Sequence, residues 1–303
     1  MVNFINRHKT TLKAGSDWIR EDIDYELDML KTLYLPKFKE KHEDLSVSSV
    51  SNNSLLRFFD SEFIKNDPNA SYTLLSYSTL FGFEAYRSDY ISTDDTLIDS
   101  FTHTGEPAKR SLREHKLLEH HLLDYIQTAL ILRNKKAMQF YATLQIRNSI
   151  PGRYYFVHDR DFEHLLILLC GKANEEIQTH LLTMKSKDYL QSLLGLPFQT
   201  TYLIPYLQSL FLPLIDVYLA LLLGREDMFN ETLYVALLKH KAYYESEENG
   251  ESRSSLPQGW VSLPLTAVCA LAHDRGLKRE VESDYIPEWL VKGEFEGLAL
   301  TVE

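Results

Sequence analysis

Histidines and acidic residues at helical spacing are the strongest sign of metal chemistry in this sequence. In REHKLLEHHLLD, His115 and Glu119 are four residues apart, and so are His120 and Asp124. Residues four apart share one face of an α-helix, where an imidazole and a carboxylate can hold a metal ion together. The segment therefore offers metal ligands if it forms a helix.

A helical phosphohydrolase of the HD type needs a His, then a His-Asp dipeptide, then a distant Asp. His120, His158-Asp159 and Asp216 occur in that order, and a metal held between them would lower the pKa of a bound water. However, Asp159 (or Asp161) stands where a helix N-cap is expected, and Asp216 lies in an apolar run. A chain with eleven histidines also forms His-Asp pairs by chance; a second one is His273-Asp274. We therefore rank this enzyme below two binding functions.

Other catalytic signatures do not occur in the sequence. It has no GxGxxG, GxxxxGK[ST] or GxSxG pattern. Its two cysteines, Cys170 and Cys269, each follow apolar residues, so we expect buried, reduced thiols. The sequence thus predicts a protein that is not an enzyme and has no cofactor and no metal ion.

Acidic residues near the C-terminus are the best candidate for a binding surface. The chain carries a net charge of −11, and residues 280–303 contain seven acids and one base. Such a surface steers a basic partner and disfavours sequence-independent nucleic-acid binding, although a merely solvated acidic face is an equal alternative. The candidate binding residues are Glu245, Glu247, Glu248, Glu251, Glu282, Asp284, Tyr285 and Glu288.

The segments that must position these residues are typical of an all-α protein. Glycine is scarce, with 12 in 303 residues, and apolar residues recur at helical spacing. We expect the first long helix to end or kink at Pro36, and other helices to end at Gly171, Gly224 and Gly276. The expected helices cover 17–38, 54–65, 70–90, 111–144, 159–171, 173–186, 187–196, 201–224, 225–246 and 263–276; 46–54 and 247–259 are expected loops, and RYYFV is an expected extended piece.

These helices predict one domain over residues 1–303. We expect antiparallel packing through short loops, with helix-pair stacking as a variant, although the sequence shows no clean repeat. The apolar run from Tyr202 to Leu223 is broken by Pro205, Pro213 and Asp216, so we expect a core helix rather than a membrane span. The first residues lack the apolar stretch of a secretory signal, and we expect a cytoplasmic protein.

The C-terminal third resembles the immunity protein 49 family of bacterial polymorphic-toxin systems. The resemblance covers roughly residues 205–290, in the stretches GREDMFNETLYVALLKHKAYYES and ALAHDRGLKREVESDYIPEWLV. It rests on Gly224, Phe229, Leu237, His240, Ala272, Arg275, Gly276, Val281, Glu282, Ser283, Asp284, Tyr285 and Pro287.

This resemblance implies an all-α protein that binds and neutralises a toxin delivered by competing bacteria, without catalysis. Such toxins are often nucleases with cationic grooves, and the acidic surface permits a basic toxin domain as partner. Independently of the resemblance, the net negative charge and the broken apolar runs lead us to expect no binding to nucleic acid and none to a membrane. A helical scaffold or adaptor for other proteins is the second hypothesis, and the HD-type hydrolase is the third.

Overall fold

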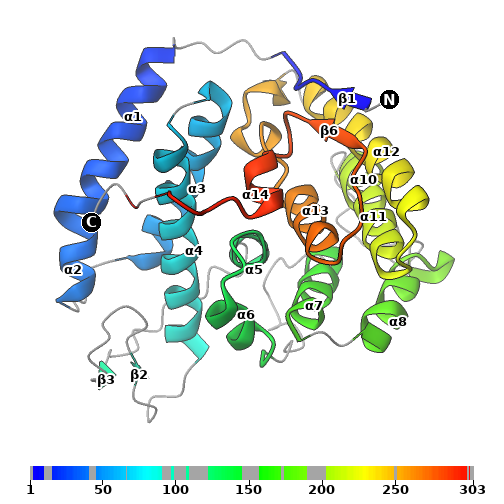
Figure 1. The fold of residues 1–303 in the computed structure, drawn as a ribbon, viewed down its shortest axis with the longest axis horizontal. Coiled ribbons are helices and arrows are strands. Elements are labelled where there is room, and N and C mark those ends of the chain that lie inside the picture. The colour runs from blue at the N-terminus through cyan, green and yellow to red at the C-terminus, as the bar shows by residue number, and fades with distance from the viewer. Residues whose placement is uncertain are drawn as a thin grey trace. The chain divides into compact units, whose positions relative to one another are not determined.

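The computed structural model describes residues 3–9, 16–40, 46–65, 67–90, 97–98, 107–108, 122–144, 157–171, 174–189, 203–248, 251–298 and 300. Contacts divide the chain into two compact units. Unit 1 comprises Met1–Lys13 and Ile126–Phe295, and unit 2 comprises Ala14–Tyr125 and Glu296–Glu303. Helices dominate both units, which confirms the all-α class (Figure 1). A single domain over 1–303 stays a prediction.

Unit 2 is built around a pair of long helices, α3 and α4, with α1 packed against α3 (Figure 1). The side chains between them, among them Ile23, Phe58, Leu74 and Phe81, are fully buried. Its elements are α1 (Ser16–Met29), a π-helical turn η1 (Leu30–Tyr34), α2 (Leu35–Lys39), α3 (Val47–Ile64), α4 (Pro68–Tyr90) and the antiparallel strands β2 (Leu97–Ile98) and β3 (Pro107–Ala108).

Of the two outcomes expected at Pro36, an end or a kink of the first helix, the end does not occur. The chain passes from α1 through η1 into α2, and Pro36 takes an early position of α2. A proline lacks an N–H, so the wider hydrogen-bonding pattern of a π turn before it lets the helix continue. The same solution recurs in unit 1, where a π turn ends at Phe211 just before Leu212-Pro213.

The serine-rich segment 46–54, expected to be a loop, is the first half of α3. Two of its serines, Ser51 and Ser54, are fully buried and hydrogen-bonded rather than solvated. The Ser51 hydroxyl donates to the Ser78 carbonyl oxygen at 2.7 Å, and the Ser54 hydroxyl donates to Glu26 Oε1 at 3.2 Å. Buried hydroxyls with partners lose little stability, so tertiary contacts overrode the turn-forming preference of serine.

The buried carboxyl of Glu26 gives the protein an expected pH dependence. Burial raises the pKa of Glu26 from 4.5 to about 7. Because the folded-state value exceeds the unfolded one, folding favours the protonated acid, and stability falls as pH rises from 4.5 through 7. We expect Glu26→Gln to increase the free energy of unfolding by about 2 kcal/mol at pH 8 and by little at pH 4.

Urea unfolding at the two pH values measures this difference. Glu21→Gln is the matched control, because Glu21 lies on the same helix and is exposed. An equal gain for Glu26→Gln at both pH values would show that the buried charge is not its cause.

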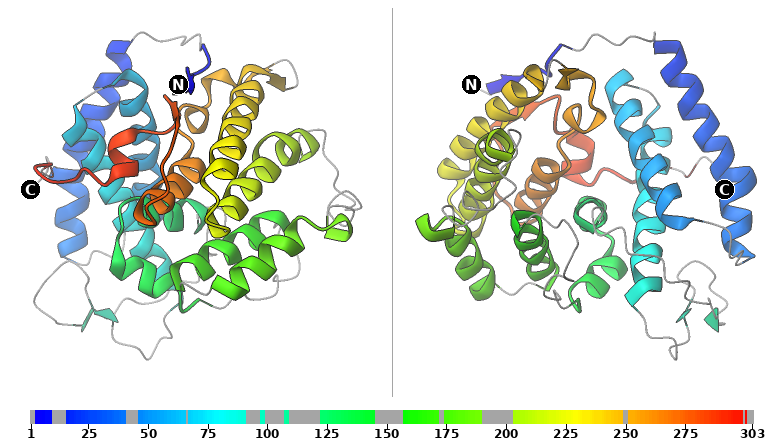
Figure 2. Two further views of the ribbon diagram at one scale, coloured as in Figure 1. Left: turned by 45° about the vertical axis from the view of Figure 1, so that its right-hand side comes forward. Right: turned by 180° about the vertical axis from the view of Figure 1, so that it is seen from behind.

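In unit 1, α11 packs against both α12 and α13 (Figure 2). Helix α5 (Leu122–Ile131) crosses the boundary between the units. The other helices are α6 (Lys135–Tyr141), α7 (Val157–Gly171), α8 (Asn174–Met184), α10 (Leu203–Tyr206), η3 (Leu207–Phe211), α11 (Leu212–Leu222), α12 (Glu226–Glu245), α13 (Leu263–Asp274) and α14 (Glu288–Lys292).

Two short strand pairs complete unit 1. Strands β1 (Asn3–Ile5) and β6 (Val281–Ser283) pair in parallel, with Phe4 opposite Glu282. Strands β4 (Glu247–Glu248) and β5 (Glu251–Ser252) form an antiparallel hairpin, followed by the 3₁₀ turns η4 (Arg253–Ser255) and η5 (Pro257–Gly259). The β1–β6 pairing ties the N-terminal segment to unit 1.

The apolar run predicted to be a core helix forms one continuous helical stretch in unit 1. Among the described helices, Ile204–Leu222 has the length and mean hydropathy, 1.5, of a membrane span, but 56% of this window is buried inside the structure. Asp216 on this stretch pairs with Lys185. Core helices meet the same length and hydropathy criteria, so this observation is weak evidence for a membrane span.

Several predicted boundaries in unit 1 are confirmed and others are wrong. Gly224 and Gly276 follow α11 and α13 with φ of 63° and 79°, the left-handed conformation of a helix stop. Gly171 is the last residue of α7 but does not have a positive φ. Helix α7 begins at Val157, so neither Asp159 nor Asp161 is its N-cap.

Most of the predicted extended piece RYYFV and of the 187–196 helix lies outside the described residues.

Candidate functional site

The acidic residues before η4 lie at the C-terminal end of α12 and on the β4–β5 hairpin. Glu245 is the last residue of α12 and is exposed, as is Glu247. Glu248 and Glu251 pair across the hairpin, and their side chains are outside the described part of the structure. All four predicted residues of this group are therefore close in the fold.

This segment is packed structure, although the sequence predicted a flexible loop. Arg253 is only 6% exposed, and its guanidinium lies 4.4 Å from the centre of the Tyr243 ring. Arg253 Nη1 also donates to Ser246 Oγ at 2.6 Å. Stacking and hydrogen bonding of one arginine thus fix the hairpin to the end of α12.

Glu282 and Asp284 lie on and just after β6. Glu282 is exposed on the outer side of the strand, between the buried Val281 and Ser283. Asp284 is half-buried and is held by the N-terminal segment, because the Arg7 backbone N–H donates to Asp284 Oδ2 at 3.3 Å. Glu282 therefore presents its charge to solvent, whereas the charge of Asp284 is partly engaged.

Tyr285, proposed from the sequence as an aromatic anchor, has no exposed surface. Its hydroxyl oxygen accepts a hydrogen bond from the His8 backbone N–H at 2.7 Å and lies 3.0 Å from His8 Nδ1. Its ring packs against His240, with the ring centres 4.7 Å apart. Tyr285 therefore fixes the N-terminal segment to the interior, and the partner-binding surface has to be formed by other residues.

The histidines of this interior cluster are held neutral by burial. Burial lowers the pKa of His240 to about 3 and also lowers the pKa of His8. Both rings interact with backbone carbonyl oxygens: His8 Nε2 lies 3.1 Å from Ser254 O, and His240 Nε2 lies 3.3 Å from Gly259 O. Neutral imidazoles with such partners have a structural role.

Glu288, on α14, is surrounded by bases. It pairs with Arg279, and its Oε1 lies 3.4 Å from Lys292 Nζ. Its charge is therefore largely compensated within the protein. Of the predicted set, Glu245, Glu247, Glu282 and Glu288 have exposed side chains. Glu288 is paired with two bases, whereas Glu245 is paired only loosely with Lys241 at 3.9 Å.

Most of the residues proposed from the sequence as metal ligands are not described by the structure. His115, Glu119 and His120 lie outside the described residues, and the side chains of His158 and Asp159 are not described. Asp216, the last member of the HD-type set, pairs with Lys185. In the part of the chain that the structure describes, no group of three or more His, Cys, Asp or Glu residues is arranged to hold a metal ion.

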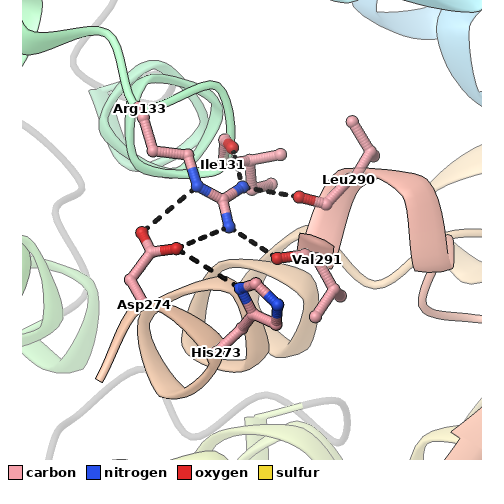
Figure 3. A network of polar contacts seen from close by, with 6 residues as sticks. All are labelled: Ile131, Arg133, His273, Asp274, Leu290 and Val291. Carbon is pink, nitrogen blue, oxygen red and sulfur yellow. Dashed lines mark hydrogen bonds and ion pairs between the residues drawn. The ribbon is translucent and has the colours of Figure 1, made fainter. Parts of the chain in front are cut away.

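The second His-Asp dipeptide takes part in a structural network centred on Arg133 (Figure 3). Arg133 Nε and Nη2 donate to the two carboxylate oxygens of Asp274 at 3.2 and 3.0 Å. Its other donors reach the carbonyl oxygens of Ile131, Leu290 and Val291, each at 2.5 Å. One guanidinium therefore joins the ends of α5, α13 and α14, and Asp274 has a structural partner.

Both cysteines are buried and free, as the sequence predicted. Burial raises the pKa of Cys170 to about 12 and that of Cys269 to about 11. The thiols therefore stay protonated at neutral pH, which makes them poor nucleophiles and poor metal ligands.

Comparison with known protein families gives a match that covers most of unit 1. A family model described as immunity protein 49 matches residues 86–290. The matched region contains α12, α13, β6 and the hairpin, and it extends well upstream of the resemblance found at residues 205–290. No curated protein and no solved structure matches the chain.

Proposed function

Because the chain belongs to the immunity protein 49 family, we propose that it neutralises one cognate bacterial toxin by forming a stoichiometric complex with it. The family match over residues 86–290 is the observation that carries this proposal. The complex blocks the toxin without any bond being made or broken by the immunity protein, which acts in the cytoplasm of the producing cell.

The partner we propose is a basic toxin domain, such as a nuclease with a cationic substrate groove. The chain has a net charge of −11, and its exposed carboxylates at Glu245, Glu247 and Glu282 occur in neighbouring elements of unit 1. Opposite charge on two surfaces speeds their association and selects against partners of like charge. These charges support a basic partner over an acidic one.

Co-expression tests this function. The probe is the C-terminal domain encoded by the reading frame immediately upstream of the gene for this chain, expressed in a host that it prevents from growing. We expect growth to be restored when the full chain is produced, and the two proteins to co-purify in a one-to-one ratio. An upstream domain that still arrests growth, with no complex, would contradict the proposal.

A further inference from the structure

The outer face of α12 carries apolar side chains where a helix on the surface normally carries polar ones. Tyr234, Val235 and Leu238 are 37%, 42% and 43% exposed, and Ala242 continues the same face one turn later and is exposed. We call these four residues the α12 stripe. The opposite face of α12 is already used, because Leu233, Leu237 and Tyr244 are buried in unit 1.

Acidic residues stand at both ends of the α12 stripe. Glu231 precedes it and Glu245 follows it, and both are exposed. They are fourteen residues apart on one helix, which corresponds to about 21 Å along the axis. Glu247 then follows Glu245 on the β4–β5 hairpin and is also exposed. The stripe is therefore an apolar centre with acidic ends.

The two lysines near the stripe compensate only part of this charge. Lys239 donates a hydrogen bond to the Gln208 carbonyl oxygen at 3.2 Å and keeps its positive charge, and Lys241 lies 3.9 Å from Glu245. Glu231, Glu245 and Glu247 outnumber these two bases, so the ends of the stripe keep a net negative charge. A partner that covers this face is most favourable when it brings basic side chains to the ends of the stripe.

The same charges disfavour a second copy of this chain as the occupant. In an antiparallel pairing of two α12 helices centred on Leu238, Glu231 of one copy meets Glu245 of the other. In a parallel pairing each of these acids meets its own equivalent. Both symmetric arrangements bring like charges together and lose stability.

We propose that the α12 stripe is the apolar centre of the surface that binds the toxin domain, and that the toxin covers it with an apolar patch flanked by basic side chains. This inference rests on the proposed function and adds the place of binding. Apolar side chains at the centre of an interface carry most of its binding energy, while a charged rim sets the rate of association.

Leu238→Arg tests the location. It puts a charge of the same sign as the partner's into the centre of the stripe, and we expect the dissociation constant for the upstream-encoded toxin domain to rise about 30-fold or more. Leu182→Arg is the matched control, because Leu182 is 53% exposed on α8 of the same unit. We expect it to change the constant by less than about threefold.

Isothermal titration calorimetry on the full chain gives the constants, and circular dichroism checks that each variant is folded. If Leu238→Arg unfolds the chain, the double variant Tyr234→Ala/Val235→Ala replaces it, with an expected loss of about tenfold. Wild-type affinity in the folded stripe variants would overturn the inference while leaving the proposed function standing. A wild-type chain that fails to bind the toxin domain would overturn the proposed function, and the location with it.

Light scattering on the chain alone tests the alternative occupant of the stripe, a second copy of this chain. We expect a monomer. A wild-type dimer that Leu238→Arg converts to a monomer would assign the stripe to a second copy and would overturn the inference.

Discussion

Replacing Arg133 by alanine should lower the free energy of unfolding by about 3 kcal/mol. This is the largest effect on stability that we expect from a single partly exposed residue. The change leaves the carbonyl oxygens of Ile131, Leu290 and Val291 without their charged donor and leaves Asp274 without its bidentate partner. Hydrogen bonds to a charged group contribute about 1.5–3 kcal/mol each, and water will replace part of that contribution at this half-buried site.

One further variant separates the contribution of the side chain from that of the backbone. Arg133 has a φ of 52°, a conformation that costs a non-glycine residue about 1 kcal/mol. Arg133→Gly should therefore be less damaging than Arg133→Ala by about that amount, yet still well below wild type. Arg225→Ala is the control, since Arg225 pairs only with the exposed Asp227 at 3.0 Å. Denaturant unfolding measures all three, and a stable Arg133→Ala protein would refute the proposed role of this network.

Reversing the charges of Glu245, Glu247 and Glu282 should slow association with the toxin domain about 10- to 100-fold at low salt. These carboxylates are exposed and, in the described residues, lie near the apolar stripe of α12 or on the adjoining strand β6. Long-range attraction acts mainly on the association rate and is screened by salt, so the difference should shrink at 0.5 M NaCl.

Net charge alone would produce a weaker version of the same effect, so the control has to match it. Glu175→Lys/Glu176→Lys/Asp188→Lys changes three other exposed acids of unit 1 and shifts the net charge by the same amount. Stopped-flow fluorescence gives both association rates. Equal slowing in the two triple variants would mean that charge acts without regard to place, against an acidic surface at these three residues.

The sequence predicted the helices of unit 1 well where a local signal was strong. Helix α12 has a continuous run of helix-forming residues, and α11 and α13 are followed by Gly224 and Gly276 in the left-handed conformation. The helix that continues past Pro36 and the helical segment 46–54 could not be predicted, because a π turn and the buried partners of Ser51 and Ser54 depend on tertiary packing.

The candidate surface could be predicted only in part. Charge counting found Glu245, Glu247 and Glu282, which are exposed. It also selected Tyr285, whose burial depends on His8, 277 residues away in the chain. The exposed stripe of α12 was not predicted. A helix with apolar residues on both faces has the pattern of a core helix, and the sequence does not show which face is buried.

The central claim is that this chain neutralises a toxin by occupying it, and an activity titration tests that claim most directly. Toxin activity is measured at a fixed toxin concentration far above the dissociation constant while the full chain is added. Our account predicts a linear fall to zero at one equivalent. Complete inactivation by a small fraction of an equivalent would indicate catalysis, and activity that persists at molar excess would indicate no neutralising complex; either result would contradict the account.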